Sequence, residues 1–158
     1  MPLTTRKRPR PGDVIEISTP VGLAYAQYTH KHEAPPRYGA LIRVLPGIFS
    51  SRPADFRSLV QQHERFWVFF PVGSACHRGM VRVVAEEELP LWAYRFPTFR
   101  RGRDGFWFIW DGQSERQVEE LSATERDYPW QNGIWNTAML VARIANGWAP
   151  PGSEGRGT

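Results

Sequence analysis

Three short strand-like runs, separated by turn residues, constrain the fold of this chain more than any other feature. They cover residues 12–17, 23–29 and 39–45, with Pro20 and Gly22 between the first two and Pro46-Gly47 after the third. Runs of this length, rich in β-branched and aromatic residues and bounded by Gly and Pro, are typical of strands in an antiparallel sheet. The rest of the chain must therefore pack on this sheet or extend it.

Side chains alternate between the two faces of each predicted strand. Ile15 and Ile17 share one face of the first strand. In the second strand, Leu23, Tyr25 and Gln27 lie opposite Ala24, Ala26 and Tyr28. The small alanines predict that another layer of the protein approaches this strand closely.

The remaining elements follow from apolar spacing and from capping residues. We expect a helix over 51–63 with Ser51 as its N-cap, and a short helix opened by the capping box Ser122-Ala-Thr-Glu125. A last helix over 137–145 is capped by Asn136. Strands are expected at 65–71, 80–85, 106–110 and 115–118, a turn at 73–79, a loop at 89–97, and a flexible basic connector at 100–105. This pattern predicts an α+β fold, in which a strongly bent antiparallel sheet or small barrel is flanked by two to three helices.

Length and charge define the domain organisation that we expect. A chain of 158 residues is one domain by its length. We expect a disordered basic tail at 1–11, a single domain at 12–149 and a disordered tail at 150–158. The net charge of +4 equals the charge of Arg6, Lys7, Arg8 and Arg10, so the body is neutral overall. A nucleic-acid-binding domain usually carries a basic face, so this distribution argues against that class.

The sequence contains no recognisable catalytic or metal-binding motif. His30-x-His32 requires a third metal ligand, and no Cys pair or His cluster follows it. Cys76 and His77 are adjacent, and neighbours on a strand point apart. We therefore expect a non-enzymatic protein without metal or cofactor, although a small enzyme with an unidentified site stays an alternative. A single cysteine and the lack of a long apolar run predict a cytoplasmic protein without a membrane span.

Aromatic side chains beside a polar loop are the best candidates for partner binding, because Tyr and Trp anchor many protein interfaces. The predicted partner-binding residues are Tyr25, Tyr28, Tyr38 and Trp110, with a polar rim of His30, His32 and Arg43. These rings could instead cover the ends of a barrel. The alternative partner is a nucleic acid, bound by the N-terminal arm and by the arginines between Arg95 and Arg103.

The first third of the chain resembles the bacterial immunity-protein family 26. The resemblance lies in Pro11-Gly-Asp-Val-Ile-Glu-Ile17, in Gly22-Leu-Ala-Tyr-Ala-Gln27 and in Gly39-Ala-Leu-Ile-Arg-Val-Leu45. Members of that family are inferred to neutralise a cognate toxin of interbacterial competition. The resemblance implies a cytoplasmic, non-enzymatic inhibitor that occludes a protein partner such as a toxin domain. The Arg-rich tail and residues 100–105 depart from the family pattern.

Overall fold

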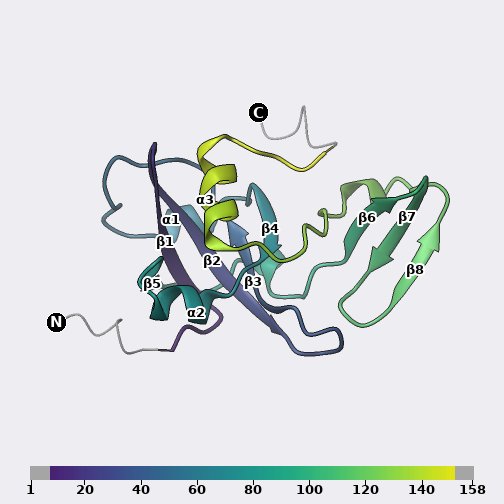
Figure 1. Cartoon of the computed structure of the whole chain (residues 1–158), viewed down its shortest axis with the longest axis horizontal. Helices are drawn as coiled ribbons and strands as arrows, with labels where there is room; N and C mark the ends of the chain where they lie inside the picture. Colours follow the sequence, from purple (N-terminus) through teal and green to yellow (C-terminus); the bar gives the residue numbers. More distant parts are fainter. Residues whose placement is uncertain (1–7, 152–158) are drawn as a thin grey trace.

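The structure, a computed structural model, describes residues 8–151 and has an α+β fold with two antiparallel sheets (Figure 1). The larger sheet has five strands in the order β4-β3-β2-β1-β5. They are β1 (Asp13–Thr19), β2 (Gly22–His32), β3 (Gly39–Val44), β4 (Phe66–Phe69) and β5 (Arg82–Glu86). Within the described residues no pairing joins β4 to β5, so the sheet is open and the small-barrel form of the prediction is unconfirmed.

The three strands predicted at the start of the chain form the centre of this sheet. β1 and β2 pair from Val14↔Gln27 to Thr19↔Gly22, and β3 pairs with β2 on its other side. Gly22 is required at the hairpin because its φ is +138°, and a Cβ there would lie 2.6 Å from the Ile48 side chain. The register of β2 against β3 shifts between Tyr28 and His30.

One face of the five-stranded sheet packs on helix α3 (Thr137–Ala145) and helix α2 (Val72–His77). Ala24 and Ala26 face this layer, as predicted, and Leu140 and Ile144 of α3 are buried against it. The Asn136 side chain accepts a hydrogen bond from the Met139 N–H (2.8 Å), which confirms the predicted cap of α3. The turn predicted at 73–79 is wrong, because most of it belongs to α2.

The opposite face carries helix α1 (Arg57–Val60), which is much shorter than the helix predicted at 51–63. The Arg52 guanidinium binds both carboxylate oxygens of Glu16 in β1 (2.8 and 3.0 Å). This ion pair holds the first residues of the predicted helix against the sheet. Ser51 is therefore not a cap, and the helix begins after Phe56. The apolar stripe that motivated the prediction is real, because Phe56, Leu59 and Val60 are buried against Tyr25 and its neighbours.

The second sheet has three strands in the order β6-β7-β8, namely β6 (Phe99–Arg103), β7 (Phe106–Trp110) and β8 (Glu115–Val118). The β7–β8 hairpin was predicted, whereas residues 100–105 are not a flexible connector. Asp104 and Gly105 have φ of 53° and 83°, the left-handed backbone of a two-residue hairpin turn, and β6 pairs with β7 from Phe99↔Trp110 to Arg103↔Phe106. The short helix opened by Ser122 is the single 3-10 turn η3 (Glu125–Asp127).

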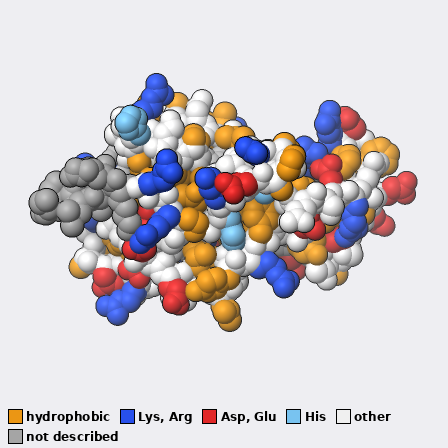
Figure 2. Space-filling model, turned by 90° about the horizontal axis from the view of Figure 1, so that it is seen from below, with side chains coloured by type: hydrophobic (Ala, Val, Ile, Leu, Met, Phe, Trp, Pro, Cys, Tyr) orange, Lys and Arg blue, Asp and Glu red, His pale blue; other side chains and the backbone are white. Residues whose placement is uncertain are grey.

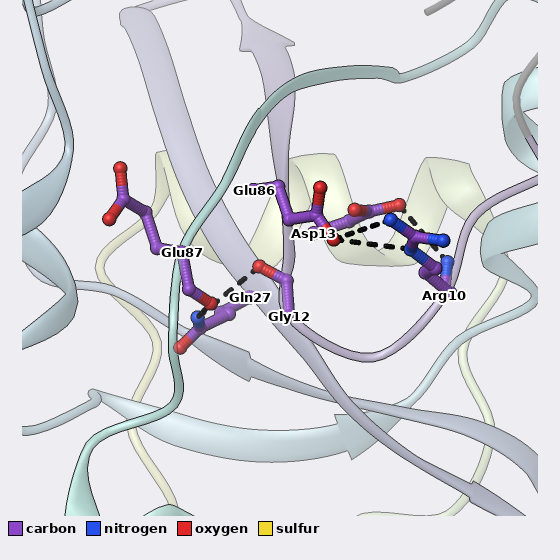
Figure 3. A network of polar contacts seen from close by, with 6 residues as sticks. All are labelled: Arg10, Gly12, Asp13, Gln27, Glu86 and Glu87. Atoms are coloured by element: carbon purple, nitrogen blue, oxygen red, sulfur yellow. Dashed lines mark hydrogen bonds and ion pairs between the residues drawn. The ribbon is translucent and has the colours of Figure 1, made fainter.

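The N-terminal arm is tied to the sheet where the described chain begins (Figure 3). The Arg10 guanidinium forms an ion pair with Glu86 of β5 (2.7 Å), and the Arg10 N–H donates to the Asp13 carboxylate (3.0 Å). The Gln27 side chain donates to the carbonyl of Glu87 (3.0 Å). Arg10, which was assigned to the predicted disordered tail, is thus held by β1 and β5. Of the two tails predicted at 1–11 and 150–158, residues 1–7 and 152–158 lie outside the described residues.

Candidate functional site

A groove of about 790 Å³ runs between the two sheets. Its walls are β4, the 3-10 turn η2 (Leu91–Ala93) with the segment after it, the start of β6, the loop at 127–130 and the chain after α3. Four tryptophans line it: Trp67, Trp92, Trp130 and Trp148. Ligand sites are typically concave and mostly apolar with a few polar groups, which matches this groove.

Trp92 is the most accessible of these tryptophans, with 38% of its surface exposed. Its ring stacks on His63 with centroids 4.1 Å apart, and its indole N–H donates to the Glu64 carboxylate (3.2 Å). The same oxygen of Glu64 accepts from the Arg43 guanidinium (2.9 Å). Trp92 is therefore held in a fixed orientation at the rim of the groove before any ligand arrives.

Trp148 is positioned by the C-terminal end of α3. Its backbone N–H donates to the Arg143 carbonyl (3.0 Å). Its ring packs edge-on against Phe66 and Trp135, with centroids 5.1 and 5.0 Å away. The sequence analysis missed Trp92, Trp130 and Trp148 as site residues. Their only signal was the large number of tryptophans, seven in one domain.

Three arginines line the same groove: Arg65, Arg95 and Arg100. The Arg100 guanidinium donates to the Tyr128 carbonyl (2.8 Å) and lies over Trp130 and Trp107. The Arg65 guanidinium donates a long hydrogen bond to the Trp148 carbonyl (3.4 Å), and burial lowers its pKa below the usual value. Arginine nevertheless remains charged in proteins. The groove therefore combines aromatic walls with fixed positive charge.

The structure places the predicted partner-binding residues in three separate parts of the fold, mostly in the interior. Tyr25 and Arg43 are fully buried on the α1 face of the sheet. The Tyr25 hydroxyl donates to Glu16 (2.8 Å), and burial with this neighbouring carboxylate raises the pKa of Tyr25. Tyr28 is buried on the opposite face, against the α3 layer. Tyr25, Arg43 and Tyr28 therefore do not share one exposed surface, because both faces of the sheet are covered.

His30, His32, Tyr38 and Trp110 lie together between the two sheets. Trp110 is buried, and Tyr38 is half-buried with its ring edge-on to Trp110 (5.2 Å). The His32 Nε2–H donates to the Gly112 carbonyl (2.6 Å), and its Nδ1 accepts from the Tyr38 N–H (3.3 Å). Both ring nitrogens of His32 are thus used to fasten the sheets together. These rings join the two sheets, and Tyr38 and Trp110 also line a second, smaller pocket.

His30 also joins the two parts, because its Nε2–H donates to the Tyr94 carbonyl (2.8 Å) while its Nδ1 is buried without a hydrogen-bond partner. Burial lowers the pKa of His30 below its usual 6.5, which outweighs the raising effect of the Tyr94 carbonyl. The folded state therefore favours the neutral ring. The stability that this provides is complete above the unfolded pKa and is lost as the pH falls from there through the folded pKa.

We expect the free energy of unfolding to decrease as the pH falls below about 6.5, and His30→Gln to reduce that decrease. Urea titrations of both proteins between pH 7.5 and pH 5 measure the difference. His77→Gln, at an exposed histidine of α2, is the matched control for the loss of a histidine. An identical profile for His30→Gln and the original chain would contradict the prediction.

Cys76 has the properties of a packing residue and not of a nucleophile. It is half-buried beside the core, and burial together with the Asp13 charge raises the pKa of its thiol to about 11. Relative to an ordinary value of 9.0, this shift leaves about a hundredfold less thiolate.

We expect iodoacetamide at pH 8 to alkylate Cys76 about a hundredfold more slowly in the folded than in the urea-unfolded chain. Equal rates, followed by mass spectrometry, would contradict this assignment.

Within residues 8–151 no group of three His, Cys, Asp or Glu side chains could hold a metal ion. In the same part of the chain, no helix has both the length and the apolar character needed to cross a membrane. Comparison with known proteins adds no relative, because no family model, no curated protein and no solved structure matches this chain.

Proposed function

We propose that this chain is a non-enzymatic protein-binding module that neutralises a partner, such as a bacterial toxin domain, by occluding it. The observation that carries the proposal is the groove between the sheets, with Trp92 oriented at its rim and Arg65 and Arg95 in its walls. Tryptophan and arginine are the residue types most enriched at the energetic centres of protein interfaces. The proposal keeps the function that the resemblance implies and moves the recognition surface to the groove.

The charge distribution favours a protein partner over a nucleic acid. Figure 2 shows basic and acidic side chains interspersed on the face seen from below, with hydrophobic groups between them. A nucleic-acid interface needs a continuous basic surface that neutralises successive phosphates. In addition, Trp92 already stacks on His63, and Trp130 already lies against the Arg100 guanidinium, so these rings offer fewer free faces for stacking bases.

Growth protection tests the proposed function. Where the gene beside that of this chain encodes a toxin, the toxin would be expressed in a bacterial host with and without the chain, and a neighbouring gene of another kind would count against the proposal. We expect the original chain to restore growth, and Trp92→Ser to weaken binding to the toxin by about thirtyfold and abolish protection, because an interface centre of this kind contributes about 2 kcal/mol. Titration calorimetry with an inactive toxin variant measures the affinity.

Tyr94→Ser is the matched control for Trp92→Ser. Tyr94 is an aromatic residue two positions away with 52% of its surface exposed, and it does not line the groove. Only its backbone carbonyl is used by His30, so this substitution keeps that bond. Protection by Trp92→Ser equal to that by Tyr94→Ser would remove the groove from the proposal. The absence of any protection by the original chain would refute the proposed function itself.

A further inference from the structure

We infer that the groove between the sheets binds an extended acidic segment of the partner protein, with Arg65 and Arg95 contacting its carboxylates. The inference rests on the proposed function and specifies the chemistry that the groove recognises. It is argued from the positive charges of Arg65 and Arg95, which have no carboxylate partner among the described residues, and from the apolar side chains that line the groove.

Arg65 is a half-buried cation without a carboxylate partner among the described residues. It directly precedes β4, and its guanidinium lies 5.8 Å from the centroid of the Phe66 ring. Among the described residues, that guanidinium donates one hydrogen bond, the 3.4 Å contact to the Trp148 carbonyl. Removing a guanidinium from water without a counter-ion is unfavourable, and a ligand carboxylate would restore the lost interaction. This arrangement favours an anionic occupant.

Arg95 and Glu64 determine the sign of the charge around Arg65. Arg95 is exposed in the wall formed by the segment after η2, and no described carboxylate pairs with it. Glu64 and Asp127 are the acidic residues that line the groove, together with Arg65, Arg95 and Arg100. Arg43 binds Glu64 at 2.9 Å and Trp92 donates to it, so the negative charge of Glu64 is compensated from within the protein. The three arginines outnumber the two carboxylates, so the formal charge of the lining is positive.

The groove also selects for a peptide-like shape. Its apolar surface comes from Trp67, Trp92, Trp148 and adjacent rings, so a segment that alternates carboxylates with apolar side chains satisfies both the arginines and the rings. A bidentate guanidinium–carboxylate pair is among the stronger polar contacts in proteins. Two such arginines provide too few contacts for the row of phosphates in a nucleic acid, which places the acidic peptide ahead of a single-stranded oligonucleotide.

Two capped hexapeptides test the inference, one of alternating glutamate and phenylalanine and one of alternating glutamine and phenylalanine. Each is titrated into the full chain, and the tryptophan indole N–H signals report the binding. We expect the glutamate peptide to bind at least about tenfold more tightly than the glutamine peptide. Arg65→Gln and Arg95→Gln should each remove most of that preference and leave the affinity for the glutamine peptide unchanged. Arg78→Gln, at an exposed arginine outside the groove, should keep it.

Several results would overturn the inference. Equal affinities for the two peptides, or a preference that survives the loss of both Arg65 and Arg95, would show that the groove does not recognise carboxylates. Tighter binding of a hexathymidine oligonucleotide than of the glutamate peptide would assign the groove to nucleic acid. Growth protection that depends on Trp92, together with equal peptide affinities, would refute this inference alone and leave the proposed function intact. A preserved preference for glutamate without any growth protection would refute the proposed function instead.

Discussion

Replacing Arg43 by alanine is expected to lower the free energy of unfolding by about 3–5 kcal/mol. Arg43 is a fully buried arginine in the middle of β3, and burial lowers its pKa while Glu64 opposes that effect. Its guanidinium donates to the Gln27 side chain (3.1 Å), to the carbonyls of Gln62 (3.1 Å) and Val60, and to Glu64. All three nitrogens of the guanidinium thus donate inside the fold.

The expected loss is large because the partners of Arg43 cannot turn toward water. The Val60 and Gln62 carbonyls lie at the C-terminal end of α1, where the last turn of a helix leaves its carbonyls without partners. Without Arg43, these carbonyls would lose this donor, and the half-buried Glu64 carboxylate would keep only its hydrogen bond from the Trp92 indole N–H among the described residues. When one partner of a buried polar network is removed, each remaining group that loses its hydrogen bond lowers the free energy of unfolding by its desolvation penalty.

Urea denaturation at pH 7 measures the effect, and Arg101→Ala is its matched control. Arg101 also forms an ion pair, with Glu115 at 3.1 Å, but both side chains are more than one third exposed. Such a surface pair contributes at most about 1 kcal/mol. If Arg43→Ala were no more destabilising than Arg101→Ala, the assignment of Arg43 as the anchor between the sheet and α1 would be wrong.

The strands at the start of the chain could be predicted because their information is local. The spacing of Ile15 and Ile17, the alternation of Ala24 and Ala26 with larger residues, and the turn glycines all act within a few positions. The helix predicted at 51–63 failed for the opposite reason. The ion pair between Arg52 and Glu16 holds its first residues outside a helix. These two residues are 36 positions apart, so a local sequence pattern cannot predict their contact.

The strand at 99–103 was missed although a local signal for it exists. Arginines and glycines suggested flexibility, whereas Asp104-Gly105 is one of the dipeptides that most strongly favour a two-residue hairpin. Gly102 has a further role that only the fold reveals, because a Cβ at that position would lie 3.3 Å from the Trp107 ring. The prediction of a flexible linker at 100–105 thus relied on the basic composition and overlooked the hairpin turn.

The candidate site was harder to predict than the fold. Tyr25 and Tyr28 point to opposite faces of β2, as in a strand with one buried and one exposed face. Both faces of this sheet are covered, however, so each tyrosine lies in a different part of the core. Trp92 lies in the single 3-10 turn η2 and Trp148 in the irregular chain after α3, and both segments are too short to show a periodic pattern. Their accessibility follows from the space left between two sheets, which is a property of the tertiary structure.

Replacing Phe69 by alanine is expected to cost about 3–5 kcal/mol and to loosen the second sheet more than the first. Phe69 is the last residue of β4 and is fully buried. Its ring contacts those of His32, Tyr38, Phe96, Phe99 and Trp110, with centroids between 4.8 and 6.4 Å apart. This single side chain therefore touches both sheets and the segment that lines the groove.

The substitution separates docking of the second sheet from formation of the first. The backbone bonds of Phe69 to Gly133 (3.0 Å) and Trp135 (2.9 Å) do not depend on the side chain, so β4 should stay in the sheet. Amides of β6 and β7 should then lose hydrogen-exchange protection by a larger factor than those of β1 and β2.

Phe106→Ala is the matched control, because Phe106 lies at the tip of the β6–β7 hairpin with 39% of its surface exposed. A surface substitution of this kind typically changes stability by about 0.5 kcal/mol or less. Uniform loss of protection across both sheets in Phe69→Ala would mean that the two sheets unfold as one unit. The aromatic joint would then be part of a single core, and the groove beside it could not widen for a ligand by movement of the second sheet alone.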